Sequence, residues 1–255
     1  MSLGHKIHRV TAPFKRALFS NYKLNYKGQG VIGFVDIGSV GGLPSPWAEN
    51  ANKIRTLLNF EPNSTSKKGP NYITSSDALW KEDATLPFHV SKTNRGVGSS
   101  LFEQNIDYVE DNWKELSRCG PSRLAKSWHR RSAVDRIVDM HCRPLDDVIR
   151  DLDSDQTFNF IKCDAQGAEY EILLGAKSTL IDSCVGLHLE LFSIPLYKGI
   201  TLAADVTSFL ETLGFRLEYK YLAHGTFDSQ NDCLFIKPNG DKEAQEVIRS
   251  VYGLA

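Results

Sequence analysis

The chain has 255 residues, which is enough for one large α/β domain or for a domain that carries a sizeable insertion. Its 41% hydrophobic and 24% charged residues are ordinary for a soluble globular protein, and its 30 basic and 31 acidic residues nearly cancel. This balance gives no overall field that would draw the chain to nucleic acid, and no apolar run reaches the ~18 residues of a membrane span.

The first 30 residues are locally basic, because they carry six Lys and Arg residues and no Asp or Glu. They lack the apolar stretch of a secretory signal. We therefore expect residues 1–30 to form a basic N-terminal helix or arm, followed by one domain over residues 31–255. The five cysteines show no metal-ligand spacing, and their odd number argues against a full disulfide framework. We expect reduced thiols and a cytoplasmic protein.

The first half of the chain predicts short buried strands joined by polar loops. A branched apolar run over residues 31–37 ends at Gly38, as a buried parallel strand does. Ser45 and Pro46 then stand where an N-cap and a first helical residue would stand, so we expect a helix over residues 46–53. Further strands are expected over residues 55–60, 72–80 and 85–90.

The second half alternates helices and strands. Residues 103–136 are charged and have a helical pattern around the break "CGPS", and we interpret them as an insertion. Apolar residues recur with helical spacing from Leu202 to Leu213, and Gly214 ends that helix. The other expected elements are a strand over 157–164, a helix between Gly167 and Gly175, strands over 185–192, 215–221 and 233–238, and a helix over 242–251.

This order predicts an α/β fold: a doubly wound sheet that is mostly parallel, with an antiparallel edge hairpin at its C-terminal end. Ligands of such sheets bind at the carboxyl ends of the strands, near the point where the strand order reverses. The strand over residues 31–37 delivers a glycine-containing loop to that edge. A ligand is therefore expected there.

The loop, "DIGSVGG" over residues 36–42, narrows the choice of ligand. It lacks the G-x-G-x-x-G spacing of a dinucleotide site and the Gly-Lys-Ser/Thr of a P-loop. The pattern suits S-adenosylmethionine, which has no phosphate, because Asp36 can engage its ammonium end while Gly38, Ser39 and Gly42 allow close approach of the ligand. A tight strand-to-helix turn also explains the glycines, so the loop alone leaves both interpretations open.

Two further acids favour the cofactor. Glu61 ends the next strand, 23 residues after Gly38, and an acid near that spacing can accept hydrogen bonds from both ribose hydroxyls. Asp77 in "SSDALW" follows a third strand, where a carboxylate can meet the adenine amine, although an aspartate in an ordinary turn explains it equally well.

A longer motif carries a resemblance to a known family. The stretch "FIKCDAQGAEYEILLGA", residues 160–176, has the Lys-x-Asp strand end, the Gly-Ala-Glu turn and the closing Gly-Ala typical of the FkbM family of S-adenosylmethionine-dependent methyltransferases. The segments "FEPN", "SSL" and "PLDDVI" add to the match. The chain resembles this family over about residues 31–219, most of its length.

The resemblance implies a class I methyltransferase (Rossmann-like) fold and transfer of a methyl group to a hydroxyl of a small molecule such as a sugar or polyketide. A neutral alcohol is a poor nucleophile, so a general base or a metal is useful. Asp164, Glu190 and His188 are the catalytic candidates, because the carboxyl ends of their strands face the reacting centre. A pocket-shaping role for Asp164 and a core role for His188 stay open.

The metal question also stays open. Asp164, Glu169 and Glu190 together offer oxygen ligands for magnesium, but their spacing is not diagnostic. Glu169 can equally support the first turn of its own helix. Basic residues around Trp128 suit an anionic or sugar acceptor, or a solvated helix face.

Two other functions remain as alternatives to a small-molecule O-methyltransferase. One is a methyltransferase that acts on protein or RNA, and the other is a nonenzymatic scaffold with a vestigial cofactor pocket. Neither the oligomeric state nor the identity of the acceptor follows from the sequence.

Overall fold

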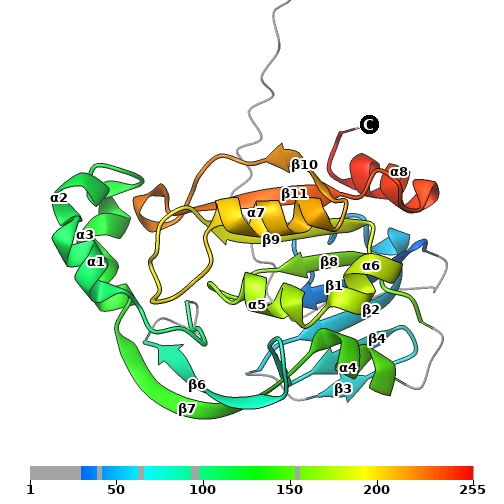
Figure 1. Cartoon of the computed structure of the whole chain (residues 1–255), viewed down its shortest axis with the longest axis horizontal. Coiled ribbons are helices and arrows are strands. Elements are labelled where there is room, and N and C mark those ends of the chain that lie inside the picture. Colours follow the sequence, from blue (N-terminus) through cyan, green and yellow to red (C-terminus); the bar gives the residue numbers. More distant parts are fainter. Residues whose placement is uncertain (1–29, 39–41, 63–65, 93–97, 153–155, 255) are drawn as a thin grey trace, which may run out of the picture.

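The computed structural model describes residues 30–38, 42–62, 66–92, 98–152 and 156–254 (Figure 1). A central sheet of eight strands runs through these residues in the order β10-β11-β9-β8-β1-β2-β4-β3, and a smaller sheet has the order β5-β7-β6. The described strands are β1 (Ile32–Ile37), β2 (Ile54–Phe60), β3 (Lys67–Lys68), β4 (Tyr72–Ser75), β5 (Ala78–Leu79), β6 (Ala84–Ser91), β7 (Val134–Arg143), β8 (Phe160–Cys163), β9 (Gly186–Phe192), β10 (Arg216–Lys220) and β11 (Gln230–Ile236).

Helices connect these strands and cover the sheet. They are α1 (Ile106–Asp111), α2 (Trp113–Leu116), α3 (Ser122–Arg131), α4 (Leu145–Asp151), α5 (Glu169–Leu174), α6 (Lys177–Asp182), α7 (Ala203–Thr212) and α8 (Lys242–Val251), with short 3-10 turns η1 (Ala51–Lys53) and η3 (Thr226–Asp228).

The strand order places the switch point between β1 and β8. From β1 the chain moves outward through β2 to β4, and it later returns to the other side of β1 with β8 and continues to β9. These five strands are parallel, whereas β11 pairs antiparallel with both β9 and β10. The structure thus confirms the doubly wound, mostly parallel sheet with an antiparallel C-terminal hairpin, and its carboxyl edge at β1 and β8 is the expected ligand site.

Alternation along each strand divides the core into two layers. Val35 and Ile37 of β1 face a cluster that contains residues of α4, α5, α6 and α7. Ile32 and Phe34 face the opposite cluster, which holds Trp47 and the apolar side of α8. Helices on both faces explain why β1 is buried along its whole length.

The segment before β2 differs from expectation. Residues 46–53 do not form the expected helix, because the chain makes turns that end in η1. Trp47 is fully buried by these turns, with its ring 5.0 Å from that of Phe34 and 4.9 Å from that of Phe160. Burial of one large aromatic ring here replaces the apolar face that a helix would have supplied.

A long hairpin carries α1, α2 and α3 away from the central sheet (Figure 1). Its strands β6 and β7 pair antiparallel from Ala84–Cys142 to Ser91–Val134, and the three helices lie between them in sequence at one end of the molecule. The strand β7 was missed by sequence reasoning, because most of its residues are at least partly exposed and their polarity does not alternate cleanly.

Other expectations concern the chain as a whole. The N-terminal arm over residues 1–30 lies, except for Gly30, outside the described residues. All five cysteines belong to the described part of the chain, and all are free thiols. Among the described helices, none is both long and apolar enough to cross a bilayer.

Candidate functional site

The site is built around the place where β1 and β8 end side by side. Gly38 follows β1 with a φ of +77°, and a Cβ atom there would lie 2.1 Å from the carbonyl oxygen of Asp164. Its N–H donates to the carbonyl of Phe60 at 3.1 Å. Only glycine satisfies both the left-handed backbone and this close approach, so the loop is held against the ends of both neighbouring strands.

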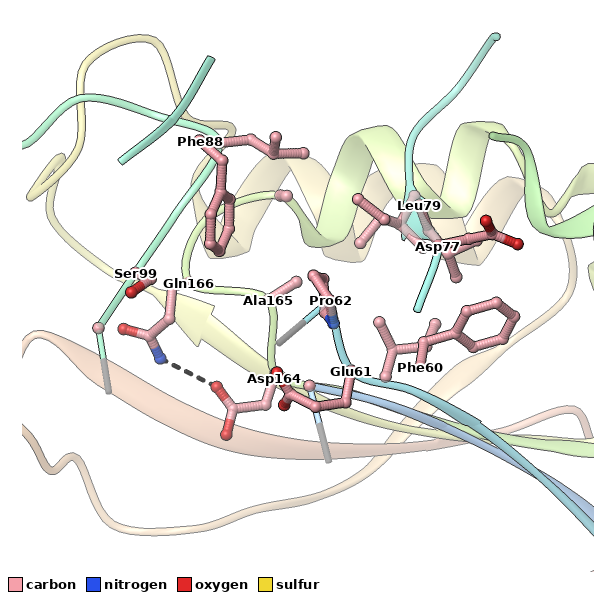
Figure 2. Close-up of a pocket in the computed structure, with 17 residues that line it drawn as sticks. Phe60, Glu61, Pro62, Asp77, Leu79, Phe88, Ser99, Asp164, Ala165 and Gln166 are labelled. Carbon is pink, nitrogen blue, oxygen red and sulfur yellow. Dashed lines mark hydrogen bonds between the residues drawn. The ribbon is translucent and has the colours of Figure 1, made fainter. Parts of the chain in front are cut away.

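A pocket opens at this edge between the central sheet and the smaller sheet (Figure 2). Gly38, Glu61, Asp77 and Asp164 all line it, and so does Gln166, which sequence reasoning did not single out. Its apolar walls are Ile37, Phe60, Leu79, Phe88, Leu101 and Ile172. The switch point therefore offers a cavity with carboxylates on one side and apolar surface on the other.

Glu61 and Asp77 reach the pocket in different ways. Glu61 directly follows β2, and its N–H donates to the Ser75 carbonyl of β4 at 3.1 Å. The carboxylate of Asp77 points away from Glu61 and Asp164 (Figure 2). It accepts from the Ser75 hydroxyl at 2.9 Å and lies 3.9 Å from the Arg143 guanidinium. Asp77 thus contributes its position beside Leu79 rather than a carboxylate directed into the cavity.

Two more of the predicted cofactor residues, Asp36 and Gly42, do not line the pocket. Asp36 is fully buried within β1, with neither carboxylate oxygen hydrogen-bonded. Burial raises the pKa of Asp36 to about 6, although the Lys162 ammonium 3.7 Å away opposes the shift. Gly42 has a φ of +101° and lies outside the lining. Ser39 lies outside the described residues.

Lys162 links Asp36 to Asp164. Residues 162 and 164 alternate onto the same face of the sheet, and the Lys162 ammonium is 3.6 Å from the Asp164 carboxylate. Burial on its own would raise the pKa of Asp164, but Lys162 and a hydrogen bond from Gln166 lower it. Asp164 is therefore ionised at neutral pH where it borders the pocket.

Gln166 ties the site together. Its Nε2 donates to Asp164 Oδ1 at 2.9 Å and to Glu190 Oε2 at 2.8 Å, and its Oε1 accepts from the Tyr197 hydroxyl at 3.1 Å. Its backbone carbonyl accepts from Ser100 Oγ at 2.7 Å. Gln166 has a φ of +54°, a strained value for a residue other than glycine that persists only when the surroundings fix it.

Glu190 and His188 project from β9 on the face that carries Lys162 and Asp164. Glu190 is buried, and this burial, with the nearby Asp164 carboxylate, raises its pKa well above the usual value. The His188 ring contacts the Tyr252 hydroxyl at 2.7 Å and the Asp232 carboxylate at 3.3 Å. Neither side chain lines the pocket, although Glu190 reaches it through Gln166.

Glu169 closes the turn that shapes the pocket. Its two carboxylate oxygens accept from the backbone N–H groups of Ala165 at 2.7 Å and Gly167 at 2.9 Å. Burial raises the pKa of Glu169 to about 8, although the two backbone N–H donors lower it. The set of Asp164, Glu169 and Glu190 considered for magnesium is not among the close groups of possible ligands in the described residues. Among the described residues, the acidic and histidine side chains that gather closely enough to hold a metal are instead Glu190, His224 and Asp232.

The comparisons with known proteins fit this geometry. The family model of the methyltransferase FkbM domain matches residues 36–217, most of the chain. That range contains every pocket-lining residue named above. The chain thus carries a methyltransferase FkbM domain and belongs to the FkbM methyltransferase family.

The chain is similar to methyltransferase FkbM from Methylobacillus flagellatus KT, with 13% identity and a TM-score of 0.45. The match covers 80% of this chain and 43% of that one, so the chain spans less than half the length of that protein. No curated protein matches the chain in sequence.

Proposed function

We propose that the protein is an S-adenosylmethionine-dependent O-methyltransferase that acts on a hydroxyl group of a small molecule such as a sugar or polyketide. The observation that carries this proposal is the convergence of Gly38, Glu61 and Asp164 in one pocket at the switch point. A backbone that tolerates no Cβ and a carboxylate at the end of the next strand are the features that a nucleoside-containing ligand requires.

We assign each part of the cofactor to residues at this edge of the sheet. Glu61 accepts hydrogen bonds from the ribose hydroxyls, and Leu79 and Phe88 provide apolar surface for the adenine beside Asp77. Gly38, with Ser39 and Gly42 in the same loop, lets the methionine part approach the backbone. Asp36 acts from beneath this loop, because it fixes Lys162, which in turn fixes Asp164.

S-adenosylmethionine, when bound, supplies an electrophilic methyl carbon on its sulfonium. The protein's task is then to align the acceptor oxygen, exclude water and accept the hydroxyl proton. Asp164 lines the pocket as a carboxylate, and we assign it the role of proton acceptor. A weak base suffices, because the hydroxyl proton becomes strongly acidic as its oxygen bonds to carbon. Gln166 and Glu190 position Asp164, and His188 positions Asp232 on the next strand.

The alternative of a protein or RNA substrate has less support. The basic residues of α3 are the candidate surface for such a partner, but Trp128 between them is buried, with its ring 6.2 Å from that of Phe227. It is therefore not an exposed platform on which a base could stack.

The test is incubation of the full chain with methyl-labelled S-adenosylmethionine and a panel of sugar and polyketide hydroxyl acceptors, followed by mass spectrometry. We expect one acceptor to gain the labelled methyl group at an oxygen, in place of the hydroxyl hydrogen. Methylation confined to protein or RNA samples, with binding that weakens steeply with salt, would replace this proposal with the alternative.

A further inference from the structure

A second cluster of polar side chains lies behind the pocket, on the antiparallel side of the sheet. Glu190 of β9 and Asp232 of β11 are direct partners in the antiparallel ladder, so their side chains project side by side from the same face. His224 joins them from the loop between β10 and β11, where two backbone hydrogen bonds with Gln230 fix its place. One atom from each of the three side chains lies within 4.8 Å of the others.

Each carboxylate has one oxygen held by a neighbouring side chain, and the side chains of Gln230 and Asp164 also approach Glu190. Glu190 Oε2 accepts from Gln166 Nε2 at 2.8 Å, and Asp232 Oδ1 lies 3.3 Å from His188 Nε2. The second oxygen of each carboxylate faces His224 Nε2, at 3.9 Å for Glu190 Oε1 and 3.2 Å for Asp232 Oδ2. Outer groups that orient one oxygen and leave the other for an ion are typical of metal sites.

His224 supports the same site. Its Nε2 atom is buried and faces Asp232 Oδ2 at 3.2 Å as an ion pair, without the alignment of a hydrogen bond. An imidazole nitrogen that faces two carboxylate oxygens is a suitable metal ligand. The remainder of the ring is accessible, with 39% of the side chain exposed, which gives an ion a path from solvent.

We propose that Glu190 Oε1, His224 Nε2 and Asp232 Oδ2 bind one divalent cation of the first transition row, such as Mn²⁺ or Zn²⁺. A ligand set of one imidazole nitrogen and two carboxylate oxygens suits these ions better than a set made of oxygen ligands alone. With metal–ligand bonds of about 2.0–2.2 Å, neighbouring ligand atoms stand roughly 3.0–3.5 Å apart. Small side-chain rotations therefore bring the three atoms into place.

The site also has a location that matters for the reaction. Gln166 Nε2 bridges Glu190 and Asp164, so an ion held by Glu190 Oε1 would be connected to the pocket through Glu190 and Gln166. An influence of the ion on Asp164 would rest on the proposed function. The binding of the ion does not. Two of the ligands, His224 and Asp232, lie beyond the family-matched range of residues 36–217.

The experiment titrates the full chain, freed of metal by a chelator, with MnCl₂ and separately with ZnCl₂, by calorimetry. Pulsed electron paramagnetic resonance of the Mn²⁺ sample reports nitrogen coordination. We expect one ion per chain with an imidazole nitrogen coupling, and roughly 100-fold weaker binding or more in His224→Ala. The matched control is His141→Ala, since His141 Nε2 also lies 3.2 Å from a carboxylate, Asp83, but on the exposed surface. That variant should bind as the wild type does.

A second variant keeps the test decisive if His224→Ala does not fold. Gln166→Ala removes no ligand but frees Glu190 Oε2, and it should weaken metal binding about tenfold. Absence of one-to-one binding, or equal binding by His224→Ala and His141→Ala, overturns the proposal. A parallel titration of metal-free protein with S-adenosylmethionine separates the two ideas. Cofactor binding without metal binding removes only the metal site, and metal binding without cofactor binding removes only the proposed function.

Discussion

The two halves of the carboxyl edge of the sheet are built differently. At the ends of β1, β2 and β4 the pocket is formed by backbone, apolar side chains and Glu61, while the Asp77 carboxylate is turned away. At the ends of β8, β9 and β11 the side chains form a connected set of charged and polar groups: Lys162, Asp164, Gln166, His188, Glu190, His224 and Asp232. The half at β1, β2 and β4 has the features of a site that recognises the shape of a ligand. The half at β8, β9 and β11 has the features of a site that moves protons and charge.

The two halves also differ in the free energy of burying charged groups. Buried charges destabilise a fold unless partners compensate them, and the raised pKa values of Asp36 and Glu190 show that compensation here is incomplete. Groups with such shifts gather at functional sites. We therefore expect substitutions in the β1–β4 half to change cofactor affinity, and substitutions in the β8–β11 half to change turnover.

The largest expected effect is that of Asp164→Asn on turnover. The amide keeps the shape of the side chain but cannot accept the hydroxyl proton, so kcat should fall by about 10²- to 10⁴-fold, with a much smaller change in cofactor affinity. Single-turnover kinetics with the labelled cofactor measures this split. Full turnover of the variant at neutral pH would show that Asp164 is not the base.

Glu61→Ala should act on the other half of the edge. Loss of charged hydrogen bonds to the ribose should weaken cofactor binding by about 10- to 100-fold, whereas kcat at saturating cofactor changes little. The same loss should appear when the wild type is given a cofactor analogue without ribose hydroxyls. Glu61→Ala should bind S-adenosylmethionine and the analogue with equal affinity. A difference between the two affinities would show that Glu61 does not bind the ribose. Glu82→Ala, in the exposed turn before β6, is the matched control.

Gln166→Ala tests whether the charged half acts as a unit. The variant loses the hydrogen bonds that position Asp164 and Glu190, and we expect kcat to fall about tenfold without a comparable change in the KM for the cofactor. The pH profile of kcat should also move, because Asp164 loses a donor that lowers its pKa. An unchanged kcat and profile would leave Gln166 a purely structural residue.

The smallest expected effect concerns stability. The pKa of Asp36 is about 6 in the fold, where it faces Lys162, Asp164 and His188, and 3.8 in the unfolded chain. The folded state thus holds the proton more tightly, and ionisation of Asp36 destabilises the fold progressively as pH rises from about 4 to just above 6. Asp36→Asn removes this penalty.

Its gain in unfolding free energy over the wild type should therefore be about 1 to 1.5 kcal/mol larger at pH 8 than at pH 5. Urea unfolding at the two pH values measures the difference. Asp139→Asn, on the exposed part of β7, should show no such dependence. A pH-independent effect of Asp36→Asn would contradict the raised pKa.

Much of the fold could be predicted from the sequence, because buried parallel strands and amphipathic helices leave strong local patterns. The run at β1, the helical spacing of α7 and the alternation in β10 all have a short-range cause. The path of residues 46–53 was not predictable in this way. Its turns depend on Trp47 packing against Phe34 and Phe160, which lie far apart in the sequence, and β7 depends on pairing with β6 rather than on its own pattern.

The candidate site shows the same limit. Gly38, Glu61 and Asp164 could be found, because each ends a recognisable strand next to the switch point. Gln166 stood in the most specific motif, but only the structure reveals that its amide joins two carboxylates. His224 and Asp232 gave no signal, since their meeting with Glu190 results from the antiparallel register of β11 on β9.

The most direct test of the central claim is a calorimetric titration of the wild-type chain with S-adenosylmethionine, alongside Glu61→Ala. We predict one-to-one binding by the wild type and clearly weaker binding by the variant. No detectable binding by the wild type, or equal binding by both proteins, would contradict the assignment of the pocket at β1 and β8 as the cofactor site.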